Sequence, residues 1–220
     1  MKCGDQPSAR VGMRSGTERL ELASKQPVRH TPGRIDGDIA MANTLNGRKV
    51  AILATDGFEQ VELTEPKKNL EEAGATVTVL SVSATPDEIK GWNKTDWGET
   101  VKVDGQVSEA DPAQFDALVL PGGQINPDKL RIDQDAVSFV KRFVATGKIT
   151  AAICHGPWVL IEADVVQGKT MTSWPSVHTD LKNAGAEWVD KEVVVDGQFI
   201  TSRKPEDIPA FSREIINALS

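Results

Sequence analysis

The residues best suited to chemistry are Cys154 and His155, which directly follow the short apolar run 149–153. Such a run is typical of a buried strand, and Gly156 and Pro157 favour a tight turn into a helix. Cys154 would then lie on a strained strand-to-helix turn, where the positive end of a helix and a neighbouring imidazole lower the pKa of a thiol. This pattern predicts a thiolate nucleophile. The alternative is a buried cysteine that packs as a small apolar residue.

A second special turn, formed by Pro121, Gly122 and Gly123, follows the apolar run 117–120. In open α/β sheets, ligands bind beyond the carboxyl ends of the strands, so we expect the two turns to border one cleft. A glycine pair leaves backbone N–H groups free to receive an oxyanion. The sequence therefore predicts an oxyanion site made by Gly122 and Gly123 together with the backbone N–H of His155.

Strands and helices must hold these turns in position, and the chain shows alternating strand and helix patterns from residue 49 onward. Continuous apolar runs predict strands of a parallel sheet covered on both faces, and helical periodicity predicts helices between them. The polar, tryptophan-rich stretch 87–109 predicts a hairpin excursion. The expected strands are 50–54, 76–80, 117–120, 149–153 and 169–172, with a hairpin at 191–202. Of the expected helices, one ends at Gly74, one contains Val137 to Val144, one spans 176–184 and one starts near Pro205. We therefore predict an α/β fold with a mostly parallel central sheet.

Length and charge limit the classes of protein to which the chain can belong. The 220 residues, 39% of them hydrophobic, suffice for one sizeable core, and a net charge of −7 argues against nonspecific nucleic-acid binding. The 2 cysteines, in very different surroundings, do not indicate a disulfide framework. No run predicts a membrane helix or a secretory signal. We expect a cytoplasmic protein without membrane contact.

The first part of the chain differs from the rest. Its arginines are scattered among Ser, Thr, Gly and Pro without sustained periodicity. This composition predicts a disordered N-terminal extension at 1–42 and places the α/β domain at 48–220.

Cofactor and metal motifs are missing from the sequence. Gly168-Lys169-Thr170 resembles the end of a phosphate-binding loop, but Ala163 stands where the first glycine of that loop must be. No dinucleotide-binding glycine motif follows a strand, no Cys-x-x-Cys pair is present, and the 3 scattered histidines do not make a zinc site. We expect neither a cofactor nor a metal ion.

Four stretches, in their order and spacing, resemble the PfpI intracellular-protease family of the DJ-one/PfpI superfamily. They are Asp56 to Leu63 (DGFEQVEL), Leu118 to Gly123 (LVLPGG), Ile153 to Pro157 (ICHGP) and Asn183 to Val189 (NAGAEWV). The resemblance covers residues 49–219. It implies a flavodoxin-like three-layer α/β sandwich with a mostly parallel central sheet, related to the class I glutamine amidotransferase domain.

The resemblance also implies roles for the predicted site residues. Cys154 matches the family nucleophile, and Glu62 matches a glutamate whose protonated carboxyl group hydrogen-bonds the sulfur. His155 matches the histidine beside the nucleophile, which is completed by an acidic residue of a neighbouring subunit. Asp128 stands at about that place, after an apparent insertion and with Asp where the family has Glu. Without the resemblance, Glu62 is an ordinary first-turn helix acid, and Asp128 caps a helix that begins near Lys129.

The activity implied by the resemblance is thiolate attack on a carbonyl carbon by a stress-related cysteine enzyme. The substrate is a peptide if the enzyme is a hydrolase, our first interpretation, or a small carbonyl compound or glycated group if it is a glyoxalase or deglycase. Trp92, Trp158 and Trp174 are expected to shape the loops that decide between these, with Trp174 binding substrate. A non-enzymatic redox sensor or holdase chaperone is the third alternative. The resemblance further implies a homo-oligomer, either a dimer or dimers assembled into hexamers.

Overall fold

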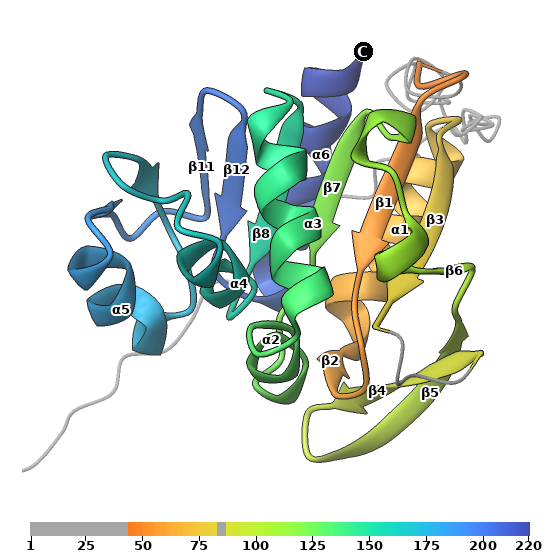
Figure 1. Cartoon of the computed structure of the whole chain (residues 1–220), viewed down its shortest axis with the longest axis horizontal. Coiled ribbons are helices and arrows are strands. Elements are labelled where there is room, and N and C mark those ends of the chain that lie inside the picture. The colour runs from red at the N-terminus through yellow and green to blue at the C-terminus, as the bar shows by residue number, and fades with distance from the viewer. Residues whose placement is uncertain (1–43, 83–86) are drawn as a thin grey trace, which may run out of the picture. The chain divides into compact units, whose positions relative to one another are not determined.

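The computed structural model describes residues 44–82 and 87–220, and the extension predicted at 1–42 lies outside them. The strands of its main sheet are β1 (Lys49–Leu53), β3 (Thr76–Ser81), β6 (Gly105–Gln106), β7 (Ala117–Leu120), β8 (Ile149–Ile153), β11 (Val193–Asp196) and β12 (Phe199–Ser202). They form a 7-stranded sheet in the order β11-β12-β8-β7-β1-β3-β6 (Figure 1). Neighbouring strands are parallel except in the edge hairpin β11–β12. The mostly parallel central sheet predicted from the sequence is confirmed.

The strand order places the two predicted turns at one edge of the sheet. The run β3-β1-β7-β8-β12 has the order of flavodoxin-like folds, in which the direction of chain progression reverses beside the first strand. Ligands bind outside the carboxyl ends of the strands at this switch point. The glycine turn follows β7 and the cysteine turn follows the adjacent β8, so both lie at this edge.

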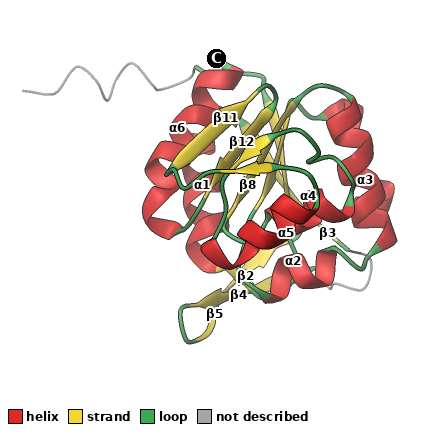
Figure 2. Ribbon diagram, turned by 90° about the vertical axis from the view of Figure 1, so that its left-hand side faces the viewer, coloured by secondary structure: helices red, strands yellow, loops and turns green. Residues whose placement is uncertain are grey.

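Helices cover both faces of the sheet (Figure 2). On one face lie α1 (Gln60–Glu72) and α6 (Ile208–Leu219), whose Leu70 and Phe211 are buried in one cluster with Ile52 of β1. On the other face lie α3 (Gln134–Ala145), α4 (Pro157–Glu162) and α5 (His178–Asn183), where Phe139 and Leu160 are buried with Leu118 of β7. The sheet is apolar on both faces because each face is covered by helices. The predicted three-layer sandwich is confirmed.

The stretch 87–109 contains the predicted hairpin, formed by β4 (Glu88–Asn93) and β5 (Asp96–Lys102). β4 also pairs in parallel with the short strand β2 (Phe58–Glu59), directly before α1. The side-chain oxygen of Gln60 accepts a hydrogen bond from the N–H of Glu99 at 2.8 Å. These contacts hold the hairpin against the start of α1, next to the carboxyl edge of the sheet (Figure 1).

Several element boundaries differ from the sequence-based prediction. The helix expected near Lys129 is α2 (Ile125–Leu130), which begins earlier and includes Asp128 in its first turn. The helices expected at 176–184 and from Pro205 each start with a 3-10 turn, Pro175–Val177 and Pro205–Asp207, because proline fits an opening turn but donates no N–H. The strand expected at 169–172 is β9 (Thr170–Met171), which pairs outside the main sheet with β10 (Glu187–Trp188). Two further 3-10 turns are Val107–Glu109 and Pro112–Gln114.

Candidate active site

Cys154 lies on the turn between β8 and α4, the two elements predicted around it. Its φ is 61°, in the left-handed region that residues other than glycine rarely adopt. Its N–H donates to the carbonyl of Ser202 at 3.0 Å, and its carbonyl accepts a hydrogen bond from the N–H of Trp174 at 2.9 Å. The strained elbow expected for a nucleophile is therefore present, held by backbone contacts on both sides.

The loop after β7 approaches this elbow closely because residue 122 has no side chain. A Cβ atom on Gly122 would lie 2.6 Å from the Cβ of Cys154 and 2.8 Å from the backbone nitrogen of His155. The N–H groups of Gly123 and His155 donate to the sulfur of Cys154. The N–H of Gly122 donates instead to a carboxyl oxygen of Glu62 at 2.9 Å. Of the predicted oxyanion donors, Gly123 and His155 thus face the sulfur, and Gly122 positions Glu62.

Glu62 is fully buried in the first turn of α1, next to the sulfur. Its Oε2 accepts the hydrogen bond from Gly122, its carboxyl group hydrogen-bonds Cys154, and no nitrogen or oxygen partner is found for Oε1 among the described residues. Burial raises the pKa of Glu62 to about 8. The carboxyl group is therefore protonated at neutral pH, as the sequence analysis expected, and it is not a solvated first-turn acid.

The sequence predicted that the surroundings lower the pKa of the Cys154 thiol, but the main contributions in the structure raise it. Burial raises the pKa of this thiol, and an ionised Glu62 would raise it further. Burial also lowers the pKa of His155 to about 4, so the imidazole is neutral at pH 7 and supplies no positive charge. Only the N–H groups of Gly123 and His155 act in the expected direction. The thiol therefore needs a base, or a proton on Glu62, to become reactive.

His155 is placed to act as that base. Its Nδ1 atom lies 3.2 Å from the sulfur of Cys154, and its Nε2 atom lies 3.3 Å from the hydroxyl oxygen of Ser176. The ring centroid lies 4.9 Å from that of Trp158 and 6.1 Å from that of Trp174. These contacts fix the orientation of the imidazole. Ser176 was not predicted, because a single serine in a turn gives no signal in the sequence.

Asp128 is exposed on α2 and does not line the pocket in front of Cys154. Within the described residues, the partner of the outer imidazole nitrogen is Ser176 rather than Asp128. A contact with the histidine of a neighbouring subunit stays a prediction.

A second residue that the sequence analysis missed is Asn126, which is fully buried beneath the glycine turn. Its Oδ1 atom accepts a hydrogen bond from the N–H of Thr55 at 2.8 Å. Its Nδ2 atom donates to the carbonyls of Pro121 at 2.9 Å and Gly122 at 3.2 Å. Asn126 therefore ties the turn after β7 to the end of β1. Its place shortly after the glycine pair was the one available hint.

The pocket in front of Cys154 has a volume of about 720 Å³, within the range of small-molecule sites. Its lining includes Trp92 and Lys94 of the β4–β5 hairpin, Trp174, and the segment 204–206 after β12. Trp92 and Trp174 thus lie where the sequence analysis expected them. Trp158 does not line this pocket; it packs against His155, and its indole N–H donates to Asp180 at 2.8 Å.

Between residues 44 and 82 and between 87 and 220, no group of three or more His, Cys, Asp or Glu side chains could hold a metal ion. In the same ranges, no helix has the length and apolar character to cross a membrane.

The sequence model of the DJ-1/PfpI family matches residues 48–218 of the chain. The protein named "Putative cysteine protease YraA" of Bacillus subtilis (strain 168) is 46% identical over 172 residues, which are 78% of this chain and 98% of that protein. "Protein/nucleic acid deglycase 2" of Escherichia coli (strain K12) is also 46% identical, over 174 residues that are 78% of this chain and 98% of that protein.

A solved structure shares the fold. It is a two-domain protein from Anabaena variabilis ATCC 29413, with DJ-1/ThiJ/PfpI-like and ferritin-like domains. The match has a TM-score of 0.73 and 40% identity, and covers 78% of this chain and 48% of that chain. The present chain therefore spans about half of that protein.

Proposed function

The chain belongs to the DJ-1/PfpI family, and from this membership we propose that it is a cysteine-dependent enzyme that attacks carbonyl groups, as a peptidase-type hydrolase or as a deglycase. One observation carries the proposal. The sulfur of Cys154 lies 3.2 Å from Nδ1 of His155 and accepts hydrogen bonds from the N–H groups of Gly123 and His155, beside the carboxyl group of Glu62. A nucleophile, a base and oxyanion donors are therefore within reach of one carbonyl carbon.

In the hydrolase reaction, Nδ1 of the neutral His155 accepts the thiol proton as the sulfur attacks the carbonyl carbon. The carbonyl oxygen takes the electron pair and is held by the N–H groups of Gly123 and His155. The bond from carbon to the leaving amine then breaks, and the imidazolium returns its proton to the amine. Water finally releases the acyl group from the sulfur. Glu62 keeps its proton and hydrogen-bonds the sulfur in its charged form.

A deglycase is the second candidate, favoured by the pocket and by a relative. The volume of about 720 Å³ fits a small group held at Cys154. A protein that is 46% identical is named a protein/nucleic acid deglycase. In this reaction the hemiaminal that a small dicarbonyl compound forms on an amine breaks its carbon–nitrogen bond, and the hydroxyl proton passes to the departing amine as an aldehyde forms. The thiol adds to that aldehyde carbon, a proton shift between the two carbons gives a thioester, and water hydrolyses the thioester to a hydroxy acid and the free thiol.

Turnover by the full chain and by Cys154→Ser tests the proposal. The substrates are a fluorogenic peptide panel, methylglyoxal and a methylglyoxal-treated peptide. Cleavage that depends on Cys154 supports the hydrolase, and Cys154-dependent release of the free amine or loss of methylglyoxal supports the deglycase or glyoxalase reaction. If neither exceeds the variant, the proposal fails. Suppression of aggregation that survives Cys154→Ser would then support the holdase alternative.

We also propose that the protein acts in the cytoplasm as a stress-related homo-oligomer, in which Asp128 approaches His155 of a neighbouring subunit. Asp128 is exposed on α2, so another chain can reach it. Removing reactive carbonyl adducts or damaged peptides is a protective chemistry, which fits a stress-related role.

A further inference from the structure

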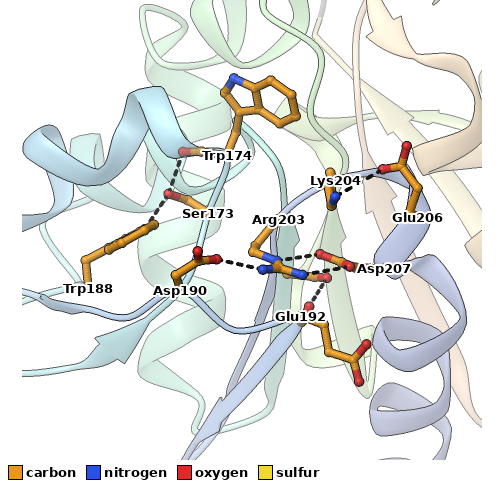
Figure 3. Close-up of polar contacts among 10 residues, drawn as sticks. Ser173, Trp174, Trp188, Asp190, Glu192, Arg203, Lys204, Glu206 and Asp207 are labelled. Carbon is orange, nitrogen blue, oxygen red and sulfur yellow. Dashed lines mark hydrogen bonds and ion pairs between the residues drawn. The ribbon is translucent and has the colours of Figure 1, made fainter. Parts of the chain in front are cut away.

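Two parts of the pocket wall are joined by two groups of polar contacts, which the short chain segment from Trp188 to Asp190 connects (Figure 3). One part is the loop that carries Trp174, and the other is the segment 204–206. On the side of Trp174, the indole N–H of Trp188 donates to the hydroxyl of Ser173 at 3.0 Å, and this hydroxyl donates to the carbonyl of Trp174 at 3.0 Å. Trp188 is therefore tied to the loop that carries Trp174.

On the side of segment 204–206, Arg203 joins three parts of the chain. Its Nη1 atom donates to Asp190 at 2.6 Å, in the loop after β10. Its Nε and Nη2 atoms donate to the two carboxylate oxygens of Asp207 at 2.8 and 3.1 Å, directly before α6. Asp207 is only 5% exposed, so this bidentate pair holds a carboxyl group that has little contact with water. Arg203 itself follows Ser202, whose carbonyl holds the N–H of Cys154.

The pair between Arg203 and Asp207 encloses the segment 204–206. Lys204 and Glu206 both line the pocket, with their charged atoms 3.9 Å apart. Because the two residues that flank the segment are bound to each other, the bidentate pair restrains the segment, and the contact of Arg203 with Asp190 ties it to the opposite wall. Trp188 and Asp190 are separated by Val189 alone, so the backbone of these three residues joins the contacts on the two sides.

The contacts of Ser173, Trp188, Asp190, Arg203 and Asp207 form what we call the polar strut. We propose that the polar strut sets the spacing between Trp174 and segment 204–206, and that Arg203 is the positioning residue at its centre. Connected charged hydrogen bonds that are partly buried hold their groups rigidly. Walls held in place need no ordering when a ligand binds, so the strut affects which groups reach Cys154 and how tightly they bind, rather than the chemistry at the sulfur.

Asp190→Asn tests this inference best, because Asp190 is 66% exposed and the buried pair of Arg203 with Asp207 remains. The matched control is Glu72→Gln, which breaks the exposed ion pair with Lys68 on α1. Both changes are made in the full chain with Cys3→Ser, so that Cys154 is the one thiol that reacts. The readout is the rate of Cys154 alkylation by a pyrene maleimide, divided by the rate with iodoacetamide.

We expect the ratio to rise about three-fold in Asp190→Asn relative to Glu72→Gln, because loosened walls admit the bulky reagent, while the iodoacetamide rate stays within about two-fold. Ser173→Ala, which cuts the strut at its other end, should raise the ratio as well. A ratio equal to the control in both variants overturns the inference, even if their Tm is lower.

Kinetic constants supply a second readout that rests on the proposed function. Where turnover is found, KM should rise about three-fold in Asp190→Asn with kcat unchanged. A fall in kcat at constant KM contradicts the inference. Alkylation needs no turnover, so an inactive wild-type chain would defeat the proposed function and leave the test of the polar strut intact.

Discussion

At the scale of single residues, we expect the proton on Glu62 to control the reactivity of Cys154. Burial raises the pKa of Glu62 to about 8, so at pH 7 its carboxyl group can donate to the sulfur. Above that pH it becomes a carboxylate that opposes a charged sulfur, and the two groups titrate as a pair. Burial disfavours charge on both groups, so a proton on Glu62 removes one obstacle to negative charge on the sulfur when a base takes the thiol proton.

Loss of the Glu62 donor should slow Cys154 at neutral pH. In Glu62→Leu the sulfur keeps the N–H donors of Gly123 and His155 but loses the carboxyl proton. We expect alkylation by iodoacetamide at pH 7 to fall about ten-fold, which corresponds to one charge-assisted hydrogen bond. Glu62→Gln keeps an N–H donor, so its alkylation rate should lie between those of wild type and Glu62→Leu. Faster alkylation in the leucine variant would mean that Glu62 acts on the thiol as a carboxylate.

The stability of the fold should depend on pH through the same residue. Between pH 4.5 and about 8 the folded chain holds a proton on Glu62 that the unfolded chain has released. The contribution of Glu62 to the unfolding free energy therefore falls as pH rises through that window. His155, with its pKa lowered from 6.5 to about 4, acts in the opposite direction below pH 6.5. From pH 6.5 to 8, Glu62 rather than His155 makes the stability depend on pH. Over this range, wild type should lose about 2 kcal/mol of unfolding free energy relative to Glu62→Gln.

Urea unfolding of both proteins at pH 6.5 and pH 8 measures this difference. A wild-type minus Glu62→Gln difference that is the same at the two pH values would show that Glu62 is already ionised at the lower one.

At the scale of elements, the close approach of the turn after β7 to the turn after β8 makes the site. This approach requires a glycine at 122, since a Cβ there would lie 2.6 Å from atoms of Cys154 and Glu62. We expect Gly122→Ala to lower kcat/KM about a hundred-fold and the unfolding free energy by about 1 to 3 kcal/mol, because the backbone must shift. Gly105→Ala in β6 is the control, because its Cβ would lie 3.4 Å from a Leu80 methyl, an ordinary contact.

Steady-state kinetics and thermal unfolding of the two alanine variants provide the comparison. If Gly122→Ala is as active and as stable as Gly105→Ala, the close approach of the two turns is not needed for the activity or the stability of the protein.

The elements that carry the site could be predicted because they are local patterns. The apolar runs before Gly122 and Cys154 are buried strands, and a glycine pair and a cysteine at strand ends mark turns at the carboxyl edge. The start of α2 could not be placed, because its first turn contains Asn126 and Pro127, which are as typical of loops as of helix starts. Ser176 and the polar strut also escaped prediction, since their contacts join loop residues that are distant in the sequence and follow no period.

At the scale of the whole molecule, the fold brings the candidate catalytic residues together within one chain except for Asp128. Glu62, Gly123, Cys154 and His155 meet at the carboxyl edge of the sheet, whereas Asp128 is exposed on α2. The pKa of Cys154 was mispredicted because its burial depends on long-range packing, which a local motif does not reveal. A contribution of Asp128 from a second chain must therefore be tested in the assembled oligomer.

Mixing two inactive variants addresses this question. If Asp128 acts across a subunit interface, Asp128→Asn and Cys154→Ser are each inactive, but mixed dimers contain one complete site. We expect an equimolar mixture, unfolded and refolded together, to regain about a quarter of wild-type activity. Size-exclusion chromatography confirms that mixed oligomers form. No recovery in verified mixed oligomers, or full activity of Asp128→Asn alone, would exclude a contribution from Asp128 in trans.

We propose above that the thiol of Cys154 is the nucleophile of an enzyme that attacks carbonyl groups. The most direct measurement is kcat/KM of the full chain, of Cys154→Ser and of Cys3→Ser on the substrate that the peptide and methylglyoxal assays identify. We expect Cys3→Ser to match wild type and Cys154→Ser to lose at least about a thousand-fold in kcat/KM, because a hydroxyl at this elbow is a far weaker nucleophile. Turnover by Cys154→Ser equal to that of wild type would contradict this proposal.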